Sequence, residues 1–196
     1  MNLLQMEESV NSDINEDDTN IHVVKNRIYF YEDINEKSIL KLTSTLDKLS
    51  SFLVNLKNEY SLSKLPKIYL HIQSYGGDVF SGLSGMNSIE NNKVPVVTIV
   101  DGFVASAATL LFLGGKTRRM QKNAHFLIHQ VRGEFWGKHD ELKDEYKNSK
   151  NLMKIIKRIY KAKSNMDSKA ISTIIVKERY MNADECLKHE LIDEIC

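Results

Sequence analysis

The sequence predicts an α/β fold in which a mostly parallel sheet packs against helices. Short apolar runs typical of strands alternate with amphipathic stretches typical of helices, and tight turns follow two of the strands. The stretch 96–113, VVTIVDGFVASAATLLFL, combines these features, because a β-branched run leads through small residues into a leucine-rich helix. Functional groups in such folds gather at the carboxyl ends of the strands, so we expect the site there.

The first part of the chain begins with a polar, acidic segment. Residues 1–20 show no periodicity, and we expect them to be mobile. Two short strands are expected within 21–31. An amphipathic helix follows, in which the apolar residues recur in steps of three and four: Ile39, Leu42, Leu46, Leu49, Leu53 and Leu56.

Two strand–turn–helix units come next. The strand 68–72 runs into the turn of Gly76 and Gly77 and then into a short helix. The strand 96–100 leads to Ser106, where a second helix begins. Both turns lie at the carboxyl ends of strands, so we expect Ser106 and the glycine pair to be neighbours in space.

The rest of the chain is expected to contain one more strand and several helices. We interpret 116–122 as a basic connection and 123–130 as a strand that ends in His129. A long, highly charged helix is expected over 139–163 and a shorter one over 167–177. Asn182 fits the cap of a last short helix, with Glu three residues on.

Composition limits the classes of function. The 196 residues suggest one domain, which we place at 21–196, and the net charge of +1 gives no sign of a nucleic-acid partner. No apolar run is long enough to span a membrane, and no signal peptide is recognisable at the start. Two cysteines near the end, Cys186 and Cys196, form neither a disulfide framework nor a zinc site, which favours a reducing compartment.

Ser106 is the candidate nucleophile. A serine at the start of a helix has backbone N–H groups beside it that can hold an anion, as acyl transfer requires. Taken alone, the pattern favours a small residue at a tight junction over a nucleophile, since serines are common at helix starts.

A hydroxyl nucleophile also needs a base. Among the six histidines His129, at the expected strand end, is the natural base, and it shares a strand face with His125. His71, in mid-strand, fits a core histidine with satisfied hydrogen bonds. The others, His22, His139 and His189, lie in the first strands or in charged helical stretches.

From Arg27 onward the chain resembles the ClpP family, the proteolytic subunits of Clp proteases. The matching stretches are IYLHIQSYGGDV, DGFVASAATLLFLGG, NAHFLIHQ and ERYMNADECLKHELIDEI, in the family's order. The resemblance implies a ClpP/crotonase-like ββα superhelix with a protruding helix, here called the handle helix, at about 139–163. It also implies a serine endopeptidase that hydrolyses unfolded polypeptides.

The resemblance assigns the site residue by residue. Ser106 falls on the nucleophile, His129 on the general base, and Gly77 and Ala107 on the N–H donors of the oxyanion hole. The family's third member, an aspartate, falls on Glu178, which is one methylene longer. Asp184 and Asp167 are the alternatives for this role. Tyr75 and Val131 replace two prolines of the family's pattern, and Ala107 and Ala108 replace Met-Gly.

The family also implies an assembly. Two stacked heptameric rings would enclose the serines, an AAA+ unfoldase would deliver substrate, and the protease itself would need no cofactor. We expect the handle helix to pack against its counterpart from a facing ring, and we expect a cytoplasmic location. The apolar stripe of this helix consists of Leu142, Tyr146, Met153, Ile156 and Tyr160.

Three other functions remain as alternatives. One is a weakly active or inactive structural subunit of a ring, because Glu178 departs from the family's aspartate. Another is a phage head-maturation protease with the same chemistry. The third is a crotonase-like acyl-CoA enzyme, although that chemistry usually relies on carboxylates.

Overall fold

The structure is a computed structural model that describes residues 20–196, so the segment 1–20, expected to be mobile, lies almost wholly outside the described residues. The strands are β1 (Ile21–Val24), β2 (Arg27–Phe30), β3 (Ile68–Ser74), β4 (Val96–Ala105), β5 (Thr117–Met120), β6 (His125–Leu127), β7 (Tyr180–Met181) and β8 (Glu194–Ile195). The helices are α2 (Glu36–Glu59), α3 (Val79–Glu90), α4 (Ala107–Leu113), α5 (His139–Ala162), α6 (Ser168–Lys177) and α7 (Ala183–Lys188). The α/β prediction is confirmed.

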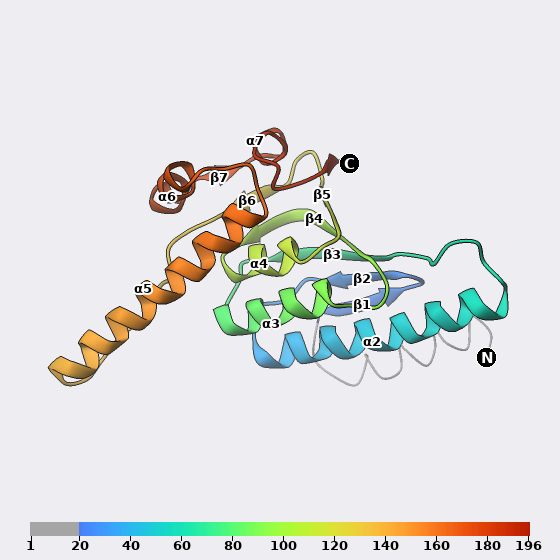
Figure 1. Cartoon of the computed structure of the whole chain (residues 1–196), viewed down its shortest axis with the longest axis horizontal. Coiled ribbons are helices and arrows are strands. Elements are labelled where there is room, and N and C mark those ends of the chain that lie inside the picture. The colour runs from blue at the N-terminus through green and yellow to red at the C-terminus, as the bar shows by residue number, and fades with distance from the viewer. Residues whose placement is uncertain (1–19) are drawn as a thin grey trace.

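The strands form a mostly parallel sheet in the order β1-β2-β3-β4-β5-β8. The β1–β2 hairpin is antiparallel, whereas the pairs β2–β3, β3–β4, β4–β5 and β5–β8 are parallel. Helices α2 and α3 lie side by side along one face of the sheet (Figure 1). This arrangement follows from the alternation of strands and helices, because a parallel neighbour can be reached only by a crossover.

Strand β4 changes partner along its length. Its first half pairs with β5, from Val97 to Val100, and its last residues pair with β6, from Phe103 to Ala105. The register against β3 also shifts at this point, since Ile72 pairs with Val100 but Ser74 pairs with Val104. The shift bends the strand and carries its carboxyl end away from β5 towards β6.

Helix α2 shows how sequence pattern and capping define an element. Asn35 accepts a hydrogen bond from the N–H of Ser38 at 2.9 Å, and the Ser38 hydroxyl lies 3.1 Å from the Asn35 N–H, which is a capping box. The apolar face of the helix packs into the core, as its three–four spacing predicts. Its buried members are Ile39, Leu42, Leu46, Leu49 and Leu53.

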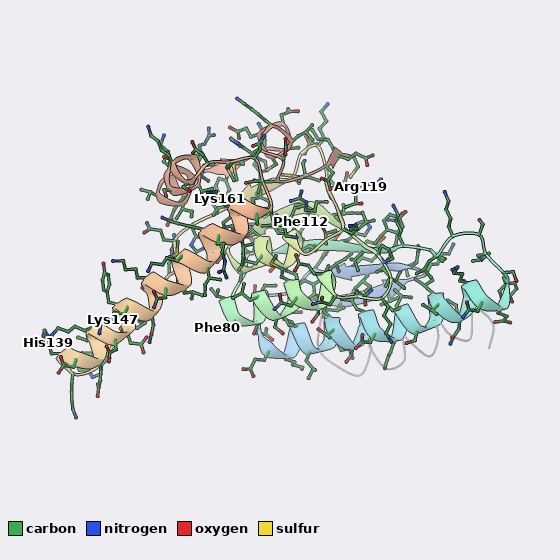
Figure 2. All side chains as sticks on the ribbon, in the orientation of Figure 1. Phe80, Phe112, Arg119, His139, Lys147 and Lys161 are labelled. Atoms are coloured by element: carbon green, nitrogen blue, oxygen red, sulfur yellow. The ribbon has the colours of Figure 1, made fainter. Side chains whose placement is uncertain are left out.

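Helix α5 confirms the long charged helix expected over 139–163. It extends away from the body of the protein, with His139 at its outer end and Lys161 near the end that meets the body (Figures 1 and 2). The apolar stripe divides into two parts. Ile156 and Tyr160 are buried in the protein's own core, whereas Leu142 and Tyr146 are exposed. The expectation that a partner must cover the whole stripe is therefore wrong for its inner part.

Three expectations about strands are corrected. The basic connection 116–122 contains β5, because β4 and β8 flank it and supply its hydrogen bonds despite its charged side chains. The strand expected over 123–130 is only three residues long and ends at Leu127, so His129 lies in the segment that follows it. The strand 96–100 is also longer than expected, since it continues to Ala105.

Candidate active site

Ser106 lies at the sharp junction between β4 and α4. Its backbone has φ 56° and ψ −128°, a conformation that a residue with a side chain adopts at a cost of about 1–3 kcal/mol. The surrounding structure holds it there, since the Ser106 N–H donates to the Leu127 carbonyl at 3.1 Å. This hydrogen bond holds the end of β6 next to Ser106.

The glycine turn meets this junction, as expected for two turns at the same edge of the sheet. A side chain at Gly76 would place its Cβ 2.7 Å from the Cβ of Ser106. At Gly77, with φ 145°, a Cβ would lie 2.2 Å from the Ile34 carbonyl oxygen. Only glycine fits this close approach. The expectation that Ser106 and the glycine pair are neighbours is confirmed.

The turns leave two backbone N–H groups available. Ala107 is the first residue of α4, where a helix has no internal acceptor for the N–H. The N–H of Gly77 donates to no acceptor within residues 20–196. On either side of it, the Gly76 carbonyl accepts from the Ile34 N–H and the Asp78 N–H donates to the Ile34 carbonyl. The two free donors flank the same cavity. This is the arrangement that an oxyanion hole requires.

The cavity beside Ser106 has a volume of about 220 Å³. It brings together four of the five residues expected in the site, namely Ser106, Ala107, Gly77 and His129. The inner end of α5 forms another wall through Ile156 and Tyr160.

His129 is half-buried, and its hydrogen bond fixes its tautomer. The ring Nδ1 lies 2.5 Å from the carbonyl oxygen of Gln130. A carbonyl only accepts, so Nδ1 carries the proton and Nε2 is left as the basic nitrogen. This is the tautomer that a general base needs, although no hydrogen bond joins Ser106 Oγ to His129 within the described chain. His125 instead is exposed and packs edge-on against Tyr180, with ring centroids 6.2 Å apart.

Glu178 is the expected site residue that does not line the cavity. It ends α6 in a left-handed conformation, with φ 48°, just before β7. Strands β6 and β7 pair Leu127 with Tyr180 in antiparallel register, so His129 and Glu178 each lie two residues beyond this pair, at the same end of the ladder. Its carboxylate, however, accepts a hydrogen bond from Arg132 at 2.6 Å.

The alternatives for the acidic role are placed elsewhere. Asp167 caps α6, where its carboxylate accepts the N–H of Ala170 at 2.7 Å. Asp184 lies in the first turn of α7. Neither lines the cavity, whereas Glu178 lies two residues before Tyr180, whose partner Leu127 leads on to His129.

A chain of hydroxyl groups beneath Ser106 escaped the sequence-based reasoning. Thr109 Oγ1 lies 2.5 Å from the carbonyl oxygen of Ser106 and 2.5 Å from the hydroxyl of Tyr160. The carbonyl accepts the single proton of Thr109, so Tyr160 must donate to Thr109. Burial raises the pKa of Tyr160 far above its usual value, which keeps the donor protonated. Hydrogen bonds thus connect the handle helix to the turn of Ser106.

A second hollow, of about 560 Å³, opens between the start of α3 and the outer part of α5. It shares Gly77, Val79, Val131 and Arg132 with the first cavity. Much of its wall is apolar, and the side chains that supply this surface include Phe80, Phe135, Leu152 and Ile155. The two hollows therefore adjoin one another, and Ser106 lines the smaller one.

His71 belongs to a separate polar cluster on the sheet and is, as expected, a core histidine with satisfied hydrogen bonds. Its Nε2 lies 2.8 Å from Arg27, which can only donate, so Nδ1 carries the proton and donates to Asp101 at 2.9 Å. Burial alone would raise the pKa of Asp101, but hydrogen bonds from His71 and Tyr31 outweigh burial and lower it. Asp101 is therefore ionised and structural.

Other kinds of site find little support in the described residues. No group of three or more His, Cys, Asp or Glu side chains among residues 20–196 is placed to hold a metal ion. Within the same range, no helix is both long and apolar enough to cross a membrane. Cys186 and Cys196 are both free thiols.

Comparisons with known proteins identify the family. The profile of the Clp protease family matches residues 11–196. The ATP-dependent Clp protease proteolytic subunit 2 of Treponema denticola is 33% identical over 137 residues, which cover 69% of this chain and 68% of the relative. The corresponding subunit of Streptococcus mutans is 36% identical over 133 residues, which cover 65% of this chain and 67% of the relative.

A solved structure confirms the fold. A mutant of ClpP1 from Listeria monocytogenes matches with a TM-score of 0.74 at 22% identity, over 87% of this chain and 91% of that chain. The prediction of a ClpP-like fold is confirmed by this match. Together with the match over residues 11–196, the similarity shows that the chain belongs to the Clp protease family, as a proteolytic subunit of the serine endopeptidase type.

Proposed function

We propose that Ser106 and His129 carry out peptide hydrolysis in the cavity that they share. Ser106 Oγ attacks the carbonyl carbon of a peptide, and Nε2 of His129 accepts the hydroxyl proton and passes it to the leaving amine. An acyl-enzyme forms and is hydrolysed by water in the same way. The supporting observation is that one cavity is lined by Ser106, His129 and the two free N–H donors.

The free N–H groups of Gly77 and Ala107 supply the oxyanion hole in this proposal. They face the position where negative charge develops on the substrate oxygen during attack. Each such donor typically contributes about 2.7–4 kcal/mol of transition-state stabilisation. The strained backbone at Ser106 and the glycine requirement at Gly77 fit this role, because both bring backbone N–H groups to the cavity.

Glu178 is proposed as the third member of the triad. It accepts the proton on His129 Nδ1 as a hydrogen bond and stabilises the imidazolium that forms during the reaction. The pairing of β6 with β7 supports this role, since His129 and Glu178 each lie two residues beyond the same pair, Leu127 with Tyr180. For this hydrogen bond to form, the bond from His129 to the Gln130 carbonyl and the bond from Arg132 to Glu178 must both break.

The assembly is also a proposal. The relatives are named proteolytic subunits of ATP-dependent Clp proteases, and we propose that this chain forms two stacked heptameric rings served by an AAA+ unfoldase in the cytoplasm. The exposed outer part of the apolar stripe supports a contact between rings through α5, because Leu142 and Tyr146 lie on a helix that extends from the body (Figure 1).

Peptide hydrolysis by single-residue variants tests the triad. We expect Ser106→Ala and His129→Ala each to lose activity to a similar extent, because members of a triad act as a unit. His125→Ala is the matched control and should keep its activity, since His125 lies outside the cavity. Full activity in Ser106→Ala, or a loss confined to His125→Ala, would refute the assignment.

Glu178→Gln tests the acidic role separately. The amide keeps the size of the side chain but cannot stabilise an imidazolium, so we expect a strong fall in kcat with little change in assembly by sedimentation. A wild-type kcat in this variant would show that Glu178 has no part in the reaction.

A further inference from the structure

The proposed hydrogen bond between His129 and Glu178 is not formed in this structure, because each side chain has another partner. The Nδ1 proton of His129 goes to the Gln130 carbonyl at 2.5 Å. The Glu178 carboxylate is held by Arg132 at 2.6 Å. Arg132 therefore competes directly with His129 for the acidic group.

We propose that Arg132 is a positioning residue that holds Glu178 away from His129 in the free subunit, and that an acidic side chain of the peptide substrate releases Glu178 by pairing with Arg132. This inference rests on the proposed role of Glu178 in the triad. It predicts that the peptidase favours acidic residues near the scissile bond.

The ion pair is weak enough to exchange. The side chain of Arg132 is 73% exposed and that of Glu178 is 31% exposed, so water and salt screen their attraction. One N–H···O contact of 2.6 Å joins Arg132 to Glu178, and a guanidinium binds other carboxylates equally well, so a substrate carboxylate can replace Glu178 without loss of hydrogen bonds. The exchange costs little and frees the Glu178 carboxylate, which lies at the same end of the β6–β7 pair as His129.

The position of Arg132 explains why a substrate would reach it. Arg132 lines the cavity of Ser106 as well as the larger hollow beside α5. It is the only arginine or lysine among the described residues that line either space. Two carboxylates, Asp78 and Glu145, also line the larger hollow, so an acidic substrate residue gains only where it meets Arg132.

The ion pair with Glu178 also depends on the guanidinium group of Arg132. Lysine would keep the charge but present one ammonium in place of a planar fork, so it should hold Glu178 less firmly. Glutamine removes the charge and frees Glu178 altogether. Arg119→Gln is the control, because it removes one positive charge from an ion pair with Glu194 that lies outside both hollows.

The experiment measures kcat and KM for two peptides that differ only in Glu or Gln beside the scissile bond. We expect Arg132→Gln to raise kcat on the Gln peptide about two- to fivefold, the range set by an exposed ion pair, and Arg132→Lys to lie between. Wild type should favour the Glu peptide by a similar factor, and Arg132→Gln should lose that preference. Arg119→Gln should behave as wild type in both respects.

Two further measurements separate positioning from a structural effect. Added salt should raise the kcat of wild type on the Gln peptide, because it screens the ion pair between Arg132 and Glu178. It should not raise the kcat of Arg132→Gln, which lacks this ion pair. Arg132→Gln should bring no gain in a Glu178→Gln background, where nothing is left to release. A gain that persists in that background, or an unchanged or lower kcat in Arg132→Gln, would overturn the inference.

Failure of the proposed triad and failure of the role of Arg132 give different results. If Ser106→Ala still hydrolyses both peptides, the proposed triad fails and this inference fails with it. If Ser106→Ala is inactive but Arg132→Gln shows neither the gain nor the lost preference, only the role of Arg132 is refuted.

Discussion

The hydrogen bond between Tyr160 and Thr109 connects the handle helix to the turn of Ser106, and a double-mutant cycle measures the coupling free energy between the two side chains. Tyr160 is only 2% exposed, and its hydroxyl donates to Thr109 Oγ1, which in turn donates to the Ser106 carbonyl. Tyr160→Phe removes the first donor and leaves the second bond intact. We expect a loss of about 0.5–1.5 kcal/mol in the free energy of unfolding, the net value of one hydrogen bond.

Thr109→Val should cost more than Tyr160→Phe. It leaves the Tyr160 hydroxyl buried without an acceptor, which costs about 1–3 kcal/mol. The Ser106 carbonyl keeps the Thr109 N–H at 3.0 Å as a donor, so this end loses less. In the double variant no buried donor is left unpaired, and we expect its loss to fall short of the sum by about 1 kcal/mol.

Urea unfolding at one fixed protein concentration measures the cycle, because assembly would otherwise shift the apparent stability. Additive losses, within about 0.3 kcal/mol, would show that the hydroxyl groups are not coupled. Burial raises the pKa of Tyr160 above the usual tyrosine value of about 10, so its stabilisation is complete below pH 10 and is lost as pH rises. The stability of wild type should therefore fall more steeply above pH 10 than that of Tyr160→Phe.

Three more predictions follow from other parts of the molecule. Gly77→Ala should lower kcat about a hundredfold or more, since its Cβ would lie 2.2 Å from a backbone carbonyl oxygen and displace an N–H donor; a kcat near wild type would exclude that donor. Leu142→Glu with Tyr146→Glu should reduce the assembly seen by sedimentation without unfolding the subunit, because both side chains are exposed; an unchanged particle would place the contact between rings elsewhere. Iodoacetamide should modify exposed Cys196 well before Cys186, whose pKa burial raises to about 12; equal rates would contradict the packing around α7.

Periodicity predicted the elements that bury a regular apolar face. The leucines of α2 and the apolar runs of β3 and β4 follow directly from the sequence, because each pattern matches the repeat of one secondary structure. The end of β4 did not follow. The strand was expected to end at Val100, but the Asp101 carboxylate is satisfied by His71 and Tyr31, and the strand continues through it to Ala105.

Strand β5 shows a second limit of sequence pattern. Its sequence, Thr-Arg-Arg-Met, contains no apolar alternation, and it forms because β4 and β8 lie on either side. Arg118 fits there by donating to the carbonyl oxygens of Lys163 and Glu190, which lie far away in the sequence. Such partners exist only in the folded chain.

The site was predicted in part. Local sequence placed Ser106 and the glycine pair at neighbouring turns, and the structure confirms that they meet. Arg132 could not be assigned a role, because its effect depends on a carboxylate 46 positions away. The sequence also could not show that the apolar stripe of the handle helix divides into a buried and an exposed part. Ile156 and Leu142 belong to the same helical pattern, but of these two only Ile156 reaches the core.

The central claim is that Ser106 is the nucleophile of a serine peptidase. The most direct measurement treats a preparation that hydrolyses peptides with a fluorophosphonate and locates the modified residue by tandem mass spectrometry. We predict one adduct, on Ser106, whose appearance parallels the loss of hydrolysis and which is absent in Ser106→Ala. An adduct on a different serine, or complete loss of hydrolysis with Ser106 unmodified, would contradict the account.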